Sequence, residues 1–323
     1  MSRGVRLAGT IVLTAAAVAY LVWKIELGTT LDVLGETELG WFVLSAAIMV
    51  LTVPVLAARW GWLLRAQEIE ERLPWLTRAY FVAYTAGQLL PTSLGGDAVR
   101  IVETARRHAG RTAVATGTVV LERGLGGAAT VLLGAVGFVL SVGRYDVSAY
   151  LWLEGIFVFG TLVLAFLFFA RSVRPLLRRA EPLLDRVRLA GLLRAFYESI
   201  HHYRGRPRLL LVVVAVTLVV QAIRILAIWA AAEAVGIELD VRVYYVMGPL
   251  FFLVMLVPFT LNGLAVREAF FVSFLGSFGV GADAAFAAGF LFFLVTLLMA
   301  LPGGAIMVWE GVRGGTRPHV EHG

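Results

Sequence analysis

The sequence contains no cysteine, and Lys24 is its single lysine. Without cysteine the chain can form no disulfide, no thiolate metal site and no cysteine nucleophile. Every histidine lies in an arginine-rich segment outside the long apolar runs, where an interfacial or tail role is the simplest interpretation. The histidines are His108, His201, His202, His319 and His322. We therefore predict no histidine base within a membrane, no metal site and no cofactor.

Charged residues are also scarce. They make up 15% of the 323 residues, against about a quarter in a soluble domain, and the mean hydropathy is +0.84. The apolar residues form runs of about 20 residues, the length that crosses a hydrocarbon core of roughly 30 Å. The net charge of +6 lies beside these runs, so lipid headgroups explain it better than nucleic acid. The composition predicts an all-α, polytopic integral membrane protein with no nucleic-acid partner.

The apolar runs predict full spans at about 7–25, 39–58, 112–141, 149–170, 209–235 and 284–309. The first resembles a signal peptide, but its length and the later spans favour an uncleaved helix. Acidic residues alone occupy the next loop (Glu26, Asp32, Glu36, Glu38), whereas arginines follow the second span (Arg59, Arg65, Arg72, Arg78). By the positive-inside rule these arginines are cytoplasmic. We expect a cell-membrane protein with both termini in the cytoplasm.

The whole chain, 1–323, is predicted to be one membrane domain. Its first half is 1–170, its second half is 209–311, and a short basic tail covers 312–323. The linker at 171–208 is rich in arginine, with apolar residues recurring every three and four positions. That pattern fits an amphipathic helix on the inner leaflet, and a plain basic loop that fixes orientation fits equally well.

Two further apolar segments are interrupted, and we predict that each forms a broken, re-entrant hairpin. Arginines flank the segment at about 75–110 on both sides, so it should enter and leave by one face. The second pair, 243–260 and 264–279, should enter from the opposite face. Irregular backbone at this depth requires cover by protein or water. The predicted break residues are Pro91, Gly95, Gly96, Pro258, Asn262 and Gly263.

The two breaks have similar sequences. PTSLGGDAVR at 91–100 and PFTLNGLAVR at 258–267 share Pro, Leu, Gly, Ala, Val and Arg in register. Paired, interrupted helices of opposite orientation indicate a transporter's binding site near the bilayer midplane. Two unrelated proline-kinked helices are the alternative interpretation.

Ionisable residues inside the apolar runs are the candidate binding residues. A charge at the bilayer centre costs at least ~2.5–3.5 kcal/mol, whereas a guanidinium fork suits a phosphate. If Asp97 caps a helix N-terminus, the arginines exceed their acidic partners and leave a positive field for an anion. The alternative is that these charged residues pair with one another and only stabilise the fold. The candidate substrate-binding residues are Arg100, Arg123, Arg224, Arg267, Glu122, Glu268 and Asp97; none is predicted to be catalytic.

Three motifs in order, LLPTSLGGDAVR, VVLERGLGG and VPFTLNGLAVREAF, resemble the flippase-like membrane domain family. This family is the transmembrane region of lysylphosphatidylglycerol synthase and its stand-alone relatives. The resemblance covers nearly the whole chain and implies movement of a lipid or polyprenyl-linked glycolipid between leaflets. Its characteristic positions map onto Pro91, Gly95, Gly96, Asp97, Arg100, Glu122, Arg123, Pro258, Gly263, Arg267 and Glu268. The chain ends shortly after its last span, so the soluble aminoacyl-transferring domain and lysyl transfer are not expected.

The sequence thus predicts a lipid translocator, not an enzyme, that moves an anionic phospholipid or a polyprenyl-phosphate-linked glycolipid. Membrane lipids are its expected partners, together with a possible separate lipid-modifying enzyme. A membrane-embedded lipid-phosphate transferase and a transporter of a small soluble anion are the alternatives. A transferase would need a general base and usually clustered carboxylates for a metal; Asp97 and Glu122 are its candidates, with no DxD-like cluster.

Overall fold

The structure is a computed structural model that describes residues 27–89, 95–141, 155, 159, 203, 205–255 and 265–314. Within these residues it contains nine helices and no strand, which confirms the predicted all-α class. The helices are α2 (Leu27–Gly35), α3 (Leu39–Ala66), α4 (Leu73–Leu89), α5 (Gly95–Arg107), α6 (Thr112–Ser141), α10 (Pro207–Glu233), α11 (Val241–Met255), α12 (Val266–Gly276) and α13 (Ala282–Gly314).

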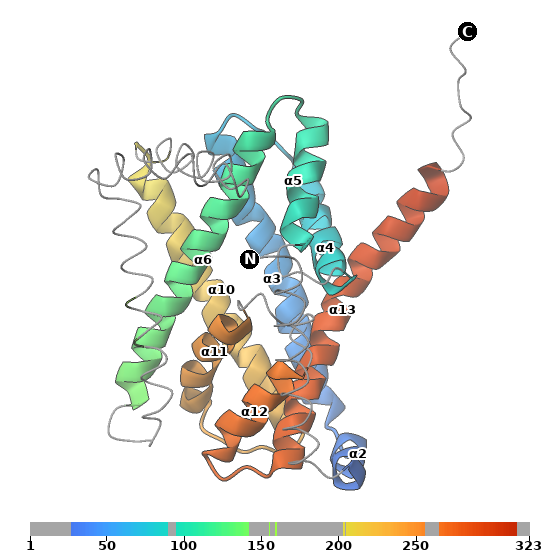
Figure 1. The fold of residues 1–323 in the computed structure, drawn as a ribbon, viewed down its shortest axis with the longest axis vertical. Coiled ribbons are helices and arrows are strands. Elements are labelled where there is room, and N and C mark those ends of the chain that lie inside the picture. The colour runs from blue at the N-terminus through green and yellow to red at the C-terminus, as the bar shows by residue number, and fades with distance from the viewer. Residues whose placement is uncertain are drawn as a thin grey trace, which may run out of the picture.

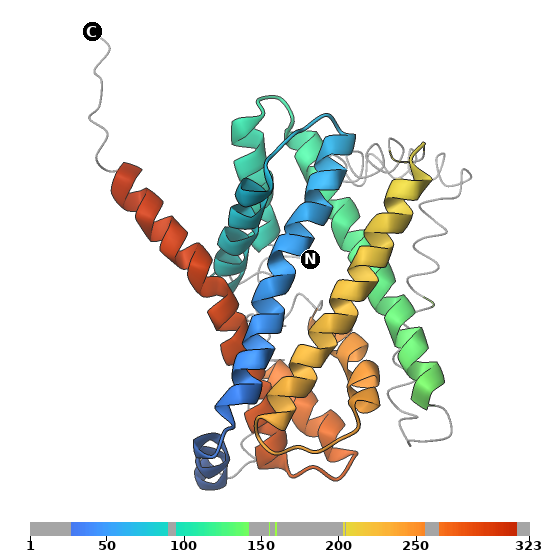
Figure 2. The same cartoon turned by 180° about the vertical axis from the view of Figure 1, so that it is seen from behind.

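Four of the described helices, α3, α6, α10 and α13, are long and apolar enough to cross a membrane. They run along the length of the bundle, and their termini lie at its two ends (Figure 1). Seen from behind, α3 and α10 run side by side and α13 leans away from the bundle (Figure 2). The chain is therefore a polytopic α-helical membrane protein.

The other helices that pack in the bundle are shorter and come in pairs. α4 has 17 residues and α5 has 13, so at 1.5 Å per residue neither crosses a core of roughly 30 Å alone. α4 runs from the upper end toward the middle and α5 returns beside it, whereas α11 and α12 occupy the lower half (Figure 1). The two pairs thus lie at opposite ends of the bundle. Their entry into a membrane as re-entrant hairpins stays a prediction.

Arginines and acids are unevenly distributed between the two ends of the bundle, although Glu68 and Glu71 lie at the arginine-rich end and Arg242 lies at the acidic end. The end where α3 and α5 finish and α6 and α10 begin carries Arg65, Arg107, Arg111, Arg206 and Arg208. The opposite end carries Asp32, Glu36, Glu38, Glu238 and Asp240. This is the asymmetry that the positive-inside rule uses to orient a membrane protein.

Two glycines allow helices to touch backbone to backbone. A Cβ at Gly96 of α5 would lie 2.4 Å from the carbonyl oxygen of Ala83 in α4. A Cβ at Gly303 of α13 would lie 2.1 Å from the carbonyl oxygen of Phe81 in α4. Thr85 adds a hydrogen bond of 2.5 Å to the carbonyl of Ala300. α4 is therefore held closely between α5 and α13.

Two sequence expectations need correction. The second span does not end at 58, because α3 continues to Ala66 and carries Arg59 inside the bundle, where 6% of the residue is exposed. The acidic segment after the first span is not wholly a loop, since it contains α2. The first span at 7–25, nearly all of 149–170 and of the linker 171–208, and the tail from 315 lie outside the described residues.

Candidate functional site

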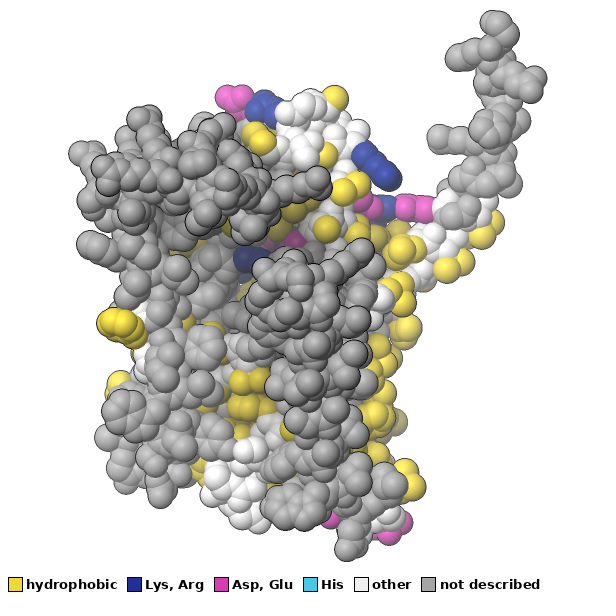
Figure 3. All heavy atoms as spheres, viewed as in Figure 1, with side chains coloured by type: hydrophobic (Ala, Val, Ile, Leu, Met, Phe, Trp, Pro, Cys, Tyr) yellow, Lys and Arg dark blue, Asp and Glu magenta, His cyan; other side chains and the backbone are white. Residues whose placement is uncertain are grey.

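A cavity of about 480 Å³ lies among α3, α4, α5, α6, α10 and α11. In the space-filling view, basic and acidic side chains are visible in a hollow on the face shown (Figure 3). Five of the seven predicted binding residues line the cavity. They are Asp97, Arg100, Glu122, Arg123 and Arg224.

Glu122 of α6 is the most heavily bonded acid in the cavity, and only 3% of the residue is exposed. Its Oε1 accepts hydrogen bonds from Arg59 Nη2 and from the Tyr80 hydroxyl, and its Oε2 accepts one from Arg100 Nη1 at 2.7 Å. Three helices, α3, α4 and α5, therefore reach α6 through this one carboxylate. Because two guanidinium groups share it, the charge of Glu122 is fully used in internal pairing.

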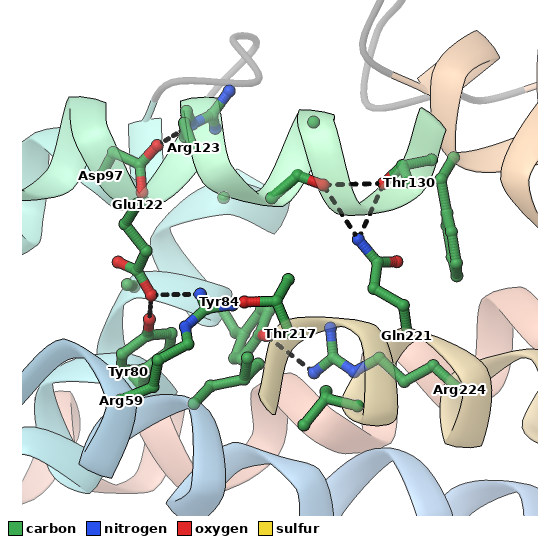
Figure 4. A pocket seen from close by; sticks show the side chains of 18 of the residues that line it. Arg59, Tyr80, Tyr84, Asp97, Glu122, Arg123, Thr130, Thr217, Gln221 and Arg224 are labelled. Carbon is green, nitrogen blue, oxygen red and sulfur yellow. Dashed lines mark hydrogen bonds and ion pairs between the residues drawn. The ribbon is translucent and has the colours of Figure 1, made fainter. Parts of the chain in front are cut away.

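Asp97 of α5 binds two arginines, Arg123 and the same Arg100 that binds Glu122 (Figure 4). Its Oδ1 accepts a hydrogen bond from Arg100 Nη2 at 2.6 Å, and its Oδ2 accepts one from Arg123 Nε. The sequence argument for unpaired arginines held only if Asp97 capped a helix instead of bonding an arginine, and that condition is not met. Asp97 does lie in the first turn of α5, but its two carboxylate oxygens face guanidinium groups.

Arg100 is held by aromatic rings as well as by acids. Its guanidinium carbon lies 4.3 Å from the centre of the Tyr80 ring and 5.0 Å from that of Trp60. Only 5% of Arg100 is exposed. Ring faces favour a nearby cation, more so when water is excluded, so Arg100 is fixed in place by partners on several sides.

Arg224 of α10 lies apart from this acidic group, together with Gln221 and Thr130 (Figure 4). Its Nε donates to Thr52 Oγ1 at 3.0 Å and its Nη2 to the Tyr84 hydroxyl at 2.9 Å. All its hydrogen-bond partners among the described residues are neutral. Arg224 is therefore a half-buried charge without an acidic partner in this part of the structure.

Gln221, one turn before Arg224, binds α6. Its amide nitrogen donates to Thr130 Oγ1 at 2.8 Å and more weakly to the Gly126 carbonyl at 3.4 Å. Its amide oxygen and the Thr130 hydroxyl extend the polar lining toward the Arg224 side. The cavity thus offers both hydrogen-bonding groups and positive charge.

The charges that line the cavity do not cancel. Four arginines, Arg59, Arg100, Arg123 and Arg224, face two carboxylates, Asp97 and Glu122, so two positive charges remain among the lining residues that the structure describes. The interior of a membrane protein disfavours such an excess. An anion bound in the cavity would compensate it.

Arg267 and Glu268, the other two predicted binding residues, do not line this cavity. They are neighbours at the start of α12, with Arg267 Nε 3.2 Å from Glu268 Oε1, and both are buried. The Arg267 guanidinium lies 4.6 Å from the centre of the Phe293 ring of α13. Arg267 Nη2 and Glu268 Oε2 have no hydrogen-bond partner among the described residues. The pair is therefore only partly satisfied in this conformation.

Among the predicted break residues, Gly95 and Gly96 begin α5. Pro91, Pro258, Asn262 and Gly263 lie outside the described residues. Ala265, just before α12, has a φ of +63°, a backbone conformation that residues with a side chain rarely adopt. The backbone therefore has an unusual conformation at the residue before α12.

The sequence did not identify Arg59, Tyr80, Tyr84 and Thr217 as part of the site. Arg59 was assigned to a cytoplasmic loop, although apolar residues continue after it as far as Leu64; that continuation was the available signal. Its Nη1 donates to Thr217 Oγ1 at 2.6 Å. The described residues contain no group of three His, Asp or Glu side chains placed to hold a metal ion.

The fold and the cavity define a polytopic α-helical membrane protein with a cavity lined by charged residues between its helices. The family model described as "Lysylphosphatidylglycerol synthase TM region" matches residues 7–304. The chain belongs to this family, as its three motifs predicted. Comparison with curated proteins and with solved structures found no match.

Proposed function

We propose that this chain moves a lipid with an anionic, phosphate-bearing head group between the leaflets of a membrane. The head group belongs to a phospholipid or to a polyprenyl-phosphate-linked glycolipid. The observation that carries the proposal is Arg224, a charge on a membrane-spanning helix whose described hydrogen-bond partners, Thr52, Tyr84 and Met299, are all neutral. A phosphate oxygen would supply the missing negative charge.

The other arginines of the cavity support a phosphate ligand in a different way. Arg123 is 38% exposed at its side chain and shares Asp97 with Arg100. A phosphate entering beside Arg123 could take over part of the role of Asp97. The acids then act as internal counterions that release an arginine when the head group arrives.

The apolar part of the cavity wall supports a lipid over a small ion. Leu56, Ala83, Val220, Phe252 and Met255 line the cavity together with the charged residues. Such a mixed wall suits a polar head group that remains attached to an acyl or polyprenyl chain. The surrounding helices also expose apolar side chains such as Leu132 and Val219, as expected for surfaces that contact lipid.

The paired short helices support an alternating mechanism. Interrupted helices of opposite orientation around a central site are a recurrent design of transporters that alternate access. In the proposal, Arg100 on α5 binds the lipid in the conformation described. Arg267 and Glu268, at the start of α12, would take part in lipid binding in the opposite conformation. Arg267 Nη2, which has no hydrogen-bond partner among the described residues, would donate to a phosphate oxygen of the head group.

The orientation follows from charge. The arginine-rich end that includes Arg65, Arg107 and Arg206 would face the cytoplasm, and the acidic end that includes Glu36 and Asp240 would face outward. α13 finishes at the arginine-rich end, and in the proposal this end of α13 faces the cytoplasm. The chain would act in the cell membrane, with a separate enzyme supplying or consuming the lipid.

The test is transbilayer movement in liposomes reconstituted with the full chain. A fluorescent phosphatidylglycerol is placed in both leaflets, and a membrane-impermeant reductant removes fluorescence from the outer one. The proposal expects a faster loss of the protected fraction than in protein-free liposomes, and faster loss for phosphatidylglycerol than for phosphatidylcholine. Equal rates with and without protein for every anionic lipid would overturn it.

Two added measurements separate the alternatives. Release of phosphate or head group from the lipid would indicate the membrane-embedded transferase. Uptake of inorganic phosphate into the liposomes without lipid movement would indicate the transporter of a small anion. Either result without lipid movement contradicts the proposal.

A further inference from the structure

A second cavity, of about 570 Å³, shares no lining residue with the cavity that contains Glu122 and Arg224. The last turn of α3 and the first turn of α10 form it, and Trp62, Arg65, Gly205, Arg206, Arg208 and Leu209 are among its lining residues. The candidate phosphate cavity also uses α3 and α10, but through residues deeper in each helix. At 1.5 Å per residue, Arg65 lies about 9 Å along α3 from Arg59.

The charge of this second cavity is of one sign. Its described lining residues include three arginines, Arg65, Arg206 and Arg208, and no acid. All three are exposed, and no ion pair joins any of them to another described residue. Three guanidinium groups around one hollow therefore direct several donors toward a single anion.

The walls of the cavity are held firmly. Tyr203 is fully buried, and its hydroxyl donates a hydrogen bond of 2.6 Å to the Leu63 carbonyl. Burial raises the pKa of this hydroxyl, so it remains a donor. Tyr203, Leu63, Ala66 and Val213 belong to one apolar cluster that joins α3 to α10. The arginines therefore lie beside a well-packed junction between α3 and α10.

The start of α10 adds to the positive potential. The helix begins at Pro207, and no side chain caps its first turn. The aligned peptide dipoles of a helix favour an anion at this end. Arg206 and Arg208 flank Pro207, so helix dipole and side-chain charge favour the same ligand.

The position of the cavity indicates where its ligand comes from. α3 and α10 are both long enough to cross a membrane, and the cavity lies where both reach the arginine-rich end (Figure 2). Tryptophan favours the headgroup level of a bilayer, and Trp62 lines the cavity. A site at this level meets lipid headgroups at high local concentration.

We propose that this cavity binds the phosphate of an anionic lipid from the leaflet at the arginine-rich end, as a site separate from the translocation cavity. Arg206 and Arg208 contact the phosphate, Arg65 contributes charge from α3, and Trp62 packs beside the upper acyl region. The proposal goes beyond lipid movement and does not depend on it. The shared chemistry is a phosphate; a free phosphate ion is the other source that the test must separate.

The experiment measures lipid binding to the full chain in detergent by native mass spectrometry. The probes are dioleoyl phosphatidylglycerol and dioleoyl phosphatidylcholine, with inorganic phosphate as a competitor. We expect Arg206→Ala/Arg208→Ala to weaken one phosphatidylglycerol site about thirtyfold, since each of the two arginines contributes about 1 kcal/mol near a lipid surface. Phosphatidylcholine binding should not change, and inorganic phosphate should not displace the lipid.

The matched control is Arg72→Ala/Arg106→Ala, which removes the same charge from exposed positions at the same end, outside the cavity. It should retain phosphatidylglycerol affinity within about twofold of the wild type. Equal losses in the two double variants would show diffuse surface charge and overturn the proposal. So would equal binding of the two lipids by the wild type, or displacement of the lipid by inorganic phosphate.

Lipid binding to the two cavities is distinguished by repeating both double variants in the Arg224→Ala background. If the second site is real, the loss caused by Arg206→Ala/Arg208→Ala persists there. Disappearance of that loss would assign the bound lipid to the translocation cavity and overturn the second site. Failure of lipid movement in liposomes, with this loss intact, would instead count against the proposed function alone.

Discussion

Arg59 on α3 donates its Nη2 hydrogen bond to Glu122 Oε1 on α6, across 63 positions of sequence. The two side chains are 7% and 3% exposed. Tyr80 and Arg100 complete the bonding of the same carboxylate. This pairing fixes the helices that surround the cavity, and it leaves Arg224 as the lining arginine whose bonds, within the described residues, go to neutral groups.

Glu122→Gln should strongly destabilise the fold. The substitution leaves Arg59 and Arg100 without their shared carboxylate, and removal of one partner from a buried ion pair typically costs about 3–5 kcal/mol. The melting temperature in detergent would fall clearly. Glu310→Gln is the matched control, because Glu310 binds Arg78 at a site where its side chain is 49% exposed, and such pairs contribute about 1 kcal/mol or less. Equal shifts in the two variants would contradict the structural role of Glu122.

Asp97→Asn should strengthen binding of an anionic ligand. The change removes one negative charge next to Arg123 and Arg100, while Glu122 still binds Arg100. We expect about fivefold tighter binding of a short-chain phosphatidylglycerol by calorimetry, from about 1 kcal/mol per charge, together with slower release and transport. Unchanged or weaker binding would show that Asp97 does not compete with the ligand for these arginines.

Gly303→Ala should disturb the contact between α13 and α4. The new Cβ would lie 2.1 Å from the Phe81 carbonyl oxygen, and overpacking of this kind costs about 1–3 kcal/mol. Gly304→Ala is the adjacent control, since its Cβ would meet Thr85 Cγ2 at 3.8 Å, an ordinary contact. Melting temperatures of the two variants test the contact. A stable Gly303→Ala protein would mean that α13 does not approach α4 this closely.

The pair on α12 tests the alternating mechanism. Arg267→Met/Glu268→Met replaces a buried ion pair by apolar side chains, an exchange that is often neutral or stabilising. We expect this double variant to fold as well as the wild type but to lose lipid transport, because the second conformation lacks its binding residues. Retained transport at normal stability would limit Arg267 and Glu268 to a structural role.

Much of this arrangement could be predicted from the sequence, because hydrophobic length and arginine position are local signals. They located α6, α10 and α13 within a few residues and brought Asp97, Arg100, Glu122, Arg123 and Arg224 together as candidates. These signals gave a wrong prediction where the depth of a residue in the bundle depends on tertiary packing. An arginine after about 20 apolar residues indicates the end of a span, but α3 is 28 residues long and carries Arg59 to a buried acid.

The pairing of charges could not be read from the sequence either. Whether Asp97 caps a helix or binds Arg123 depends on how α5 packs on α6, which the order of residues does not contain. Arg267 is a second example. It occupies the same position as Arg100 in the sequence repeat, but it does not line the cavity that contains Arg100. Sequence patterns identified the charged residues, and three-dimensional packing selected their partners.

The measurement that tests the central claim most directly compares wild type, Arg224→Ala and Arg72→Ala in the liposome assay with fluorescent phosphatidylglycerol. All three are reconstituted at equal density after their folding has been checked by melting temperature. The account predicts rapid lipid movement by the wild type and by Arg72→Ala, and movement slower by about tenfold or more for Arg224→Ala, since a phosphate–guanidinium contact contributes roughly 1.5–3 kcal/mol. Lipid movement by folded Arg224→Ala at the wild-type rate would contradict it.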